Sequence, residues 1–136
     1  MFEVFDHTAD LGLRVRASEL NALFSDAGRA LLSVIVSNPD AVQPREQICV
    51  RVDGEKPEYV FVDFLTELLF LFESKQFLGG EFEVVCDDQG LTATVRGETC
   101  DPDRHQLAHE VKAVTYHGLV VEESPDGWWA EVILDI

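Results

Sequence analysis

The sequence predicts a single α+β domain spanning residues 1–136, with two main α-helices and one or more mostly antiparallel or mixed β-sheet layers. In the first half of the chain, strand patterns and helix patterns alternate. In the second half, several strand patterns follow one another without intervening helices, and no long linker or low-complexity tract divides the chain. With 136 residues, of which 46% are hydrophobic, the chain has enough apolar area for one buried core.

The first strand and the first helix follow one another directly. Apolar and polar residues alternate over Leu11–Ala17, which is the pattern of a half-buried strand. Ser18 is a suitable N-cap for the helical spacing of apolar residues over Leu20–Ile35, and Ser37-Asn38-Pro39 ends that run. Residues 1–10, which precede the strand, are expected to be irregular.

A second strand and a second, more apolar helix come next. Ile48–Val52 alternates, and Asp53-Gly54 marks a turn. Pro57 opens a helix whose apolar residues continue to Phe72 and leave only a narrow polar strip. A helix this apolar must be covered, and we expect the cover to be the sheet of the same protein rather than the groove of a partner.

The rest of the chain is predicted to consist of strands and turns. Two turns rich in Asp and Gly, at residues 87–90 and 124–127, are typical of hairpins. The four predicted strands are Glu81–Cys86, Leu91–Gly97, Val111–Val121 and Trp128–Asp135.

The charge balance is strongly acidic, with 10 basic and 26 acidic residues and a formal net charge of −16. A negative field repels phosphate backbones and attracts cations or basic protein surfaces. We therefore expect no direct nucleic-acid binding and favour a basic protein as partner. The alternative is that the charge only confers solubility.

Cysteine usage and hydropathy indicate a cytoplasmic protein. Cys49, Cys86 and Cys100 are odd in number and widely spaced, so they indicate neither a disulfide framework nor a thiolate zinc site. The acidic N-terminal segment lacks the features of a signal peptide. The longest apolar stretch, Tyr59–Phe72, is too short and too interrupted to cross a membrane, so no membrane association is expected.

Acidic groups near the two ends of the chain are candidates for a metal site. Asp10 closes the segment His7-Thr8-Ala9-Asp10, and Asp135 stands one residue before Ile136, whose α-carboxylate must lie close to it. If the first and last strands are neighbours, Asp10 completes a site of three carboxylates for a hard cation such as Ca²⁺, Mg²⁺ or Mn²⁺. The alternative is a solvated terminal carboxylate and an Asp that caps a turn.

Two further candidates precede the last strand. His105 and His109 are four residues apart and would share one face of a short helix, but a third ligand is missing, so we expect surface or capping histidines and no zinc. Lys112 stands in an otherwise apolar or hydroxylic run. It is either an edge-strand guard, a counter-charge to a carboxylate cluster, or a contact for an anionic ligand.

Motifs of catalysis are sparse in the sequence. It contains no Gly-rich phosphate loop, no Ser nucleophile elbow and no zincin helix, and Cys100 is weak evidence for a thiol nucleophile. From chemistry alone, the sequence predicts an acidic α+β domain with a candidate divalent-cation site.

Four segments, in this order along the chain, resemble the successive signatures of the archease family. They span the chain from residue 5 to its last residue. The segments are Phe5–Gly12, Phe64–Glu73, Glu110–His117 and Val132–Ile136.

The resemblance implies an accessory protein rather than an enzyme. Archeases assist the RtcB-type RNA ligase, which joins RNA 2′,3′-cyclic phosphate or 3′-phosphate ends to 5′-hydroxyl ends in tRNA splicing and RNA repair. They promote guanylylation of the ligase on its own histidine by GTP and divalent metal, and they sustain multiple turnover.

The resemblance also implies roles for individual residues. The metal-site aspartates of the family match Asp10 and Asp135, with Ile136 contributing its carboxylate, and the functional lysine matches Lys112. His7 is expected to shape the Asp10 loop rather than to bind metal. Two other readings stay open: a stand-alone metal-dependent phosphohydrolase, and a chaperone-like binding module that uses the apolar helix.

Overall fold

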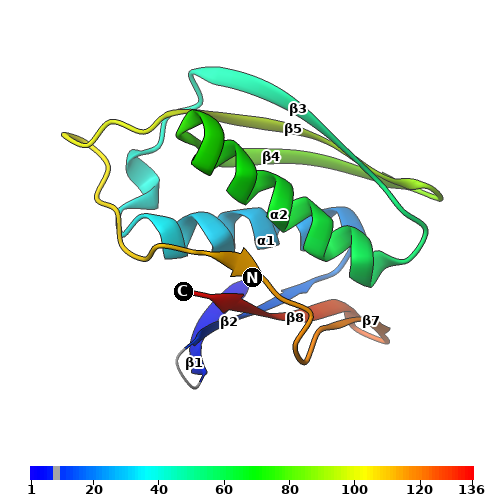
Figure 1. The fold of residues 1–136 in the computed structure, drawn as a ribbon. Helices are drawn as coiled ribbons and strands as arrows, with labels where there is room; N and C mark the ends of the chain where they lie inside the picture. The colour runs from blue at the N-terminus through cyan, green and yellow to red at the C-terminus, as the bar shows by residue number, and fades with distance from the viewer. Residues whose placement is uncertain (8–9) are drawn as a thin grey trace.

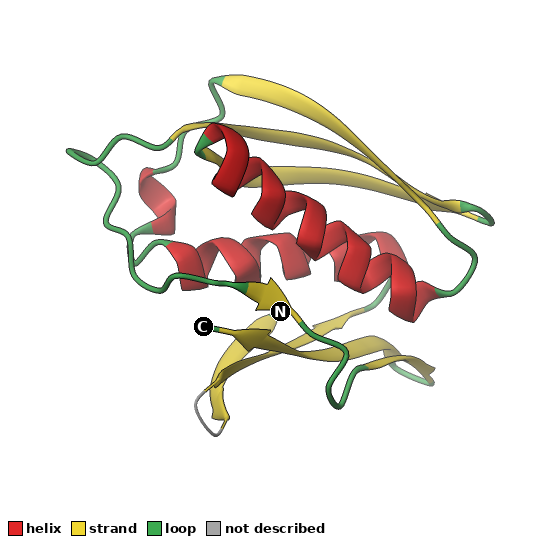
Figure 2. Ribbon diagram, in the orientation of Figure 1, coloured by secondary structure: helices red, strands yellow, loops and turns green. Residues whose placement is uncertain are grey.

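Two α-helices lie between two antiparallel β-sheets in the computed structural model, which describes residues 1–7 and 10–136 (Figure 1). The three-stranded sheet has the order β3-β5-β4 and the five-stranded sheet the order β1-β2-β8-β6, with β7 also paired to β8. Figure 2 shows the helices as a middle layer with strands on either side. The predicted α+β class with two main helices is confirmed, and every strand pair is antiparallel.

The sheets use strands from both ends and from the middle of the chain. The three-stranded sheet consists of β3 (Glu46–Asp53), β4 (Phe77–Asp87) and β5 (Gly90–Thr99). The five-stranded sheet consists of β1 (Phe2–His7), β2 (Asp10–Ala17), β6 (Ala113–Val114), β7 (Val120–Ser124) and β8 (Gly127–Asp135). The two predicted hairpin turns join β4 to β5 and β7 to β8.

The first helix, α1 (Leu20–Ile35), ends at the predicted residue and packs against β2 and β4. Its N-cap is Glu19 and makes no side-chain capping bond, so the prediction that Ser18 caps the helix was wrong. The helix begins one residue later than the sequence pattern suggested. A short 3₁₀ helix, Pro39–Ala41, follows α1 where the Pro ends the helical run.

The second helix, α2 (Pro57–Lys75), is apolar because both sheets cover it. It contacts all three strands of one sheet and also β6 and β7 of the other, and Pro57 opens it as predicted. Phe61 and Phe64 are fully buried and pack on Phe24 of α1, with ring centroids 5.6 and 5.9 Å away. Truncating such a Phe to Ala costs about 3–5 kcal/mol. The expectation that this protein covers its own apolar helix is confirmed.

The N-terminal segment is a strand, not an irregular stretch. Residues 2–7 form β1 and pair with β2 from Phe2↔Val15 to His7↔Asp10. The consecutive apolar residues Val4 and Phe5 break the alternation that would have revealed the strand in the sequence.

The predicted strand Val111–Val121 is interrupted. Only β6 and the start of β7 lie within it, and between them the Leu119 N–H donates to the Tyr116 carbonyl at 3.3 Å. Gly118 adopts a φ of 61°, a left-handed conformation that marks a turn. His117, in this turn, lies against His7 at the end of β1.

No helix in the part of the chain that the structure describes is long and apolar enough to cross a membrane.

Candidate divalent-cation site

Asp10 and Asp135 are direct partners in the β2–β8 ladder. Side chains of directly opposite residues lie on the same face of a sheet, so both carboxylates share one face. Their neighbours Leu11 and Leu134 are buried in the core, which places the two aspartates on the outer face, away from the helices. The condition set by the sequence, that the first predicted strand adjoins the last, is met.

Two further predicted residues lie beside Asp135. The Ile136 side chain is partly buried and packs against the core, which holds the end of the chain next to Asp135. The backbone N–H of Lys112 donates to the Asp135 carbonyl at 2.7 Å. The Lys112 side chain is exposed, and its ammonium pairs with no carboxylate of residues 1–7 and 10–136. Lys112 thus leads into the edge strand β6 with its charge free in solvent.

His7 stands on the other side of Asp10, as its direct partner in the β1–β2 ladder. Its Nδ1 atom is 3.7 Å from Oδ2 of Asp10, which is longer than a hydrogen bond. Nδ1 is also shielded from solvent and has no hydrogen-bond partner among the described residues. Thr8 and Ala9, the middle of the His7–Asp10 motif, lie outside the described residues.

A second imidazole, His117, packs against His7. The ring centroids are 5.6 Å apart and the planes meet at 62°, an edge-to-face contact. His117 has no role predicted from the sequence, because a continuous strand over residues 111–121 would not have carried it to β1. The signal in the sequence that could have revealed the position of His117 was Gly118, the residue that makes the turn.

The row of residues next to the two aspartates is tightly packed. The Phe5 ring covers Gly12, where an added Cβ would lie 2.1 Å from the ring. The Arg14 guanidinium lies 4.8 Å from the centroid of the same ring and donates from Nε to Glu131 at 3.0 Å. This hydrogen bond, opposed by burial and assisted by one to Glu3, raises the pKa of Arg14. Arg14 already forms ion pairs with Glu131 and Glu3, so its positive charge is neutralised within this row.

The carboxylates of the paired aspartates suit a hard cation, but two side chains do not complete its coordination shell. Like charges directly opposite each other in adjacent strands are destabilising, and a cation between them removes the repulsion. Carboxylate oxygens suit Ca²⁺, Mg²⁺ or Mn²⁺. Within the described residues, however, no three His, Cys, Asp or Glu side chains form a cluster able to hold a metal ion. A cation at Asp10 and Asp135 would need further oxygen ligands from main chain, water or a partner.

The histidine pair considered for zinc is separated by the fold. His105 is buried, with an exposed fraction of 2%, so the prediction of a surface or capping histidine was wrong for it; His109 is exposed. The backbone N–H of Asp101 donates to Nδ1 of His105 at 2.8 Å, so Nε2 carries the proton and donates to Glu98 at 3.1 Å. Both ring nitrogens are therefore used in holding the loop.

Glu98 is the centre of that buried cluster. Burial by itself raises the pKa of the Glu98 carboxyl, but hydrogen bonds from Arg104, the Gln43 backbone and His105, with the charge of Arg104, lower it to about 2. The cluster fixes the loop that precedes Lys112. Glu98 carried no signal in the sequence, because it stands in a strand pattern where an acidic residue usually faces solvent.

Comparison with known proteins identifies the family. The model of the Archease protein family matches residues 2–136. This chain belongs to the archease family. Its archease relatives include proteins of Pyrococcus furiosus and Pyrococcus abyssi, 36% and 38% identical over 140 residues, with 99% of this chain and 98% of each relative covered. The archease of Methanopyrus kandleri is 37% identical over 139 residues, with 99% of both chains covered.

Solved structures of related proteins have the same fold. The solution structure of a Methanobacterium thermoautotrophicum protein matches with a TM-score of 0.87 and 33% identity, covering 99% of this chain and 98% of the other. The crystal structure of a Thermotoga maritima archease, described as a possible chaperone, matches with a TM-score of 0.68 and 18% identity, covering 100% and 98%. The second likeness concerns the fold alone.

Proposed function

We propose that this archease-family protein is a cation-binding accessory protein of an RtcB-type RNA ligase and promotes guanylylation and multiple turnover of that enzyme in tRNA splicing and RNA repair. The observation that carries the proposal is the direct pairing of Asp10 with Asp135 on an open sheet face. The resemblance to archeases assigns metal binding to these two residues, and family membership supports that assignment.

The proposed cation site has few protein ligands, which suits a site completed by a partner. Asp10 and Asp135 supply carboxylate oxygens, and the α-carboxylate of Ile136 adds a third anionic group. A bound Ca²⁺, Mg²⁺ or Mn²⁺ would supply positive charge to phosphate oxygens. Phe5 and the His7–His117 pair border the site and fix the strands that carry the aspartates.

Docking at the GTP-bearing mouth of the ligase follows from charge. A site that binds a triphosphate and RNA phosphates carries basic side chains, and the net charge of −16 on this protein complements them. Phosphoryl transfer depends mostly on positioning and charge neutralisation, so a non-catalytic protein can accelerate it. Lys112, whose ammonium extends into solvent beside Asp135, would contact a phosphate. This mechanism requires no direct contact between RNA and this protein. We place the interaction with the ligase in the cytoplasm.

A chaperone-like role for the apolar side of α2 lacks support. The residues that make this helix apolar are packed between the two sheets, so they are not available to clients. A stand-alone phosphohydrolase would use the same carboxylates, and the experiment below distinguishes it from an accessory protein.

The test is guanylylation of the cognate ligase by GTP, with and without this protein, across Mg²⁺, Mn²⁺ and Ca²⁺. The comparison includes Asp10→Ala and a variant with one residue added after Ile136. Stimulation by the wild type that both variants lose is the expected result. Absence of stimulation under every metal condition would contradict the proposal, and hydrolysis of a nucleotide by this protein alone would favour the phosphohydrolase.

A further inference from the structure

The outward strip of α2 carries exposed aromatic side chains between acidic ones. Most of the helix is buried, yet Tyr59 is 50% exposed and Phe70 is 55% exposed. Their spacing of eleven residues puts them on one side of the helix, about 16 Å apart along its axis. Asp63 and Glu73 lie on the same exposed strip. Phe70 is more than half exposed and does not belong to the buried core.

The strip on α2 continues into the segment that follows residue 110. Strand β6 contacts α2, and Tyr116, 55% exposed, packs edge-to-face on Tyr59 with ring centroids 6.1 Å apart. The next residue, His117, contacts His7 beside Asp10. Tyr59 and Tyr116 are therefore linked through His117 and His7 to the candidate cation site.

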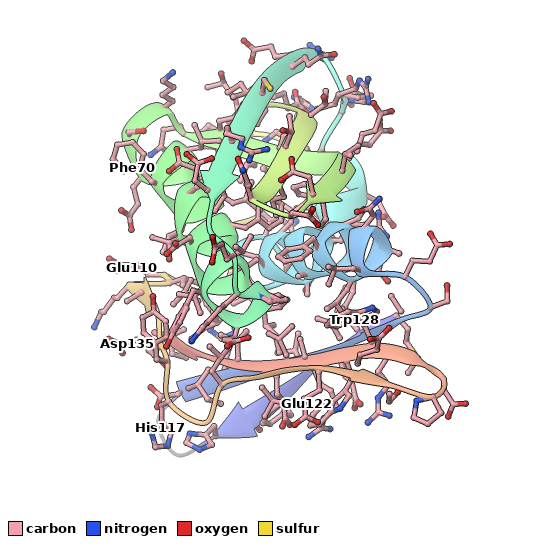
Figure 3. All side chains as sticks on the ribbon, turned by 90° about the vertical axis from the view of Figure 1, so that its right-hand side faces the viewer. Phe70, Glu110, His117, Glu122, Trp128 and Asp135 are labelled. Atoms are coloured by element: carbon pink, nitrogen blue, oxygen red, sulfur yellow. The ribbon has the colours of Figure 1, made fainter. Side chains whose placement is uncertain are left out.

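Figure 3 shows the extent of this surface. Phe70, Glu110, Asp135 and His117 follow one another down one side of the molecule, and Trp128 lies on the opposite side. We name the surface formed by Tyr59, Asp63, Phe70, Glu110 and Tyr116 the aromatic–acidic face. These residues come from α2 and from the segment around β6, which are distant in the sequence.

The chemistry of the aromatic–acidic face selects a basic protein surface over other occupants. Exposed Tyr and Phe side chains are rigid and large, which makes them effective anchors in protein interfaces. One ammonium, that of Lys56, lies 5.8 Å from the centroid of the Tyr59 ring. The carboxylates of Asp63 and Glu110 outnumber it, so the face repels a nucleic-acid backbone and attracts Arg and Lys. A second copy of this chain would bring like charges together.

We infer that the aromatic–acidic face is the docking surface for the ligase, which binds it through apolar pockets ringed by Arg and Lys side chains at the rim of its phosphate-binding mouth. The inference rests on the proposed function and adds to it the surface on which the ligase binds. Docking there sets the adjacent pair Asp10 and Asp135 against the mouth, because Tyr116 and His117 connect the two surfaces.

The experiment measures the concentration of this protein that gives half-maximal stimulation of ligase guanylylation, alongside direct binding by calorimetry. The test variant is Phe70→Ala with Tyr116→Ala, two exposed positions whose truncation leaves the core intact. The control is Val85→Ala, a 59% exposed residue on β4 of the other sheet. The expected result is an increase of about tenfold or more in the half-maximal concentration and the Kd, with an unchanged plateau. The control stays at wild-type values.

Each outcome separates this inference from the proposed function. Stimulation by the wild type together with wild-type behaviour of the double variant would overturn the docking surface and leave the proposed function intact. Ligase binding that the double variant weakens, without stimulation by the wild type, would support the docking surface and overturn the proposed function. Dimers of the wild type that the double variant dissociates, or RNA binding that it abolishes, would assign the face to another occupant and overturn the inference.

Discussion

Asp10 and Asp135 stand directly opposite each other in adjacent strands, so the fold brings together two negative charges that are 125 residues apart in the chain. Such a pair works against stability when no cation lies between the carboxylates. A sheet selected for stability alone would place an amide, a hydroxyl or an opposite charge at one of the two positions. The proposed cation would offset this repulsion.

Replacing one aspartate should distinguish the destabilising repulsion between Asp10 and Asp135 from the stabilisation that a bound cation provides. In a chelator, Asp135→Asn is expected to raise the free energy of unfolding by about 0.2–1 kcal/mol, because the like-charge pair is gone. In millimolar Ca²⁺ or Mn²⁺, the wild type should gain stability by mass action and the variant should not. Calorimetric melting with and without cation checks both. The control is Glu123→Gln, an exposed carboxylate on β7.

Because Phe5 packs on Gly12, substitutions at these two positions should have coupled effects on the free energy of unfolding. Gly12→Ala puts a Cβ 2.1 Å from the Phe5 ring, so the ring must leave its place under Arg14. The expected loss is about 1–3 kcal/mol in the free energy of unfolding. Phe5→Ala should remove most of that loss from the double variant, so a double-mutant cycle by denaturant unfolding should show strong coupling. Additive effects would mean that Gly12 is required for another reason.

The sequence predicted the elements whose pattern is local. The end of α1, the start of α2 and the two hairpin turns follow from helical or alternating periodicity and from Pro, Asp and Gly at the turns. It also singled out Asp10, Asp135 and Lys112, whose proximity depends on a strand order that periodicity does not report. The structure places these residues close together; their roles in binding and activation stay predictions.

The features that escaped prediction depend on tertiary contacts. β1 has an imperfect alternation and is defined by its pairing with β2. The position of His117 depends on a left-handed turn at Gly118, and the burial of His105 depends on Glu98, seven residues earlier in the chain. No periodic pattern encodes a histidine that is buried because a carboxylate in the preceding strand accepts a hydrogen bond from it.

The low pKa of Glu98 predicts an acid-dependent contribution to stability. The pKa falls from 4.5 to about 2 on folding, so the contribution is complete above pH 4.5 and is lost as the pH falls through about 2. Glu98→Gln should destabilise by about 3 kcal/mol near neutral pH, since it breaks a buried ion pair with Arg104. Denaturant unfolding of both proteins from pH 7 to pH 2 should show the difference shrinking below pH 4.5. A constant difference would contradict the account of Glu98.

Lys112 should matter for the partner and not for the fold. Its contact with Asp135 is made by the backbone N–H, which Lys112→Gln retains. The free energy of unfolding should change by less than about 0.5 kcal/mol, and cation affinity should stay the same. Stimulation of the ligase should fall, while Lys75→Gln, at an exposed lysine that ends α2, should retain it. Equal stimulation by the two variants would exclude a role for Lys112.

The most direct test of the central claim is the rate of ligase guanylylation as a function of divalent-cation concentration, measured with wild type, Asp10→Asn, Asp135→Asn and the control Glu123→Gln. Wild type and control should give the same cation-dependent stimulation, and both aspartate variants should lose it while remaining folded. Undiminished stimulation by either aspartate variant at every cation concentration would contradict the claim that the Asp10–Asp135 pair is the working site.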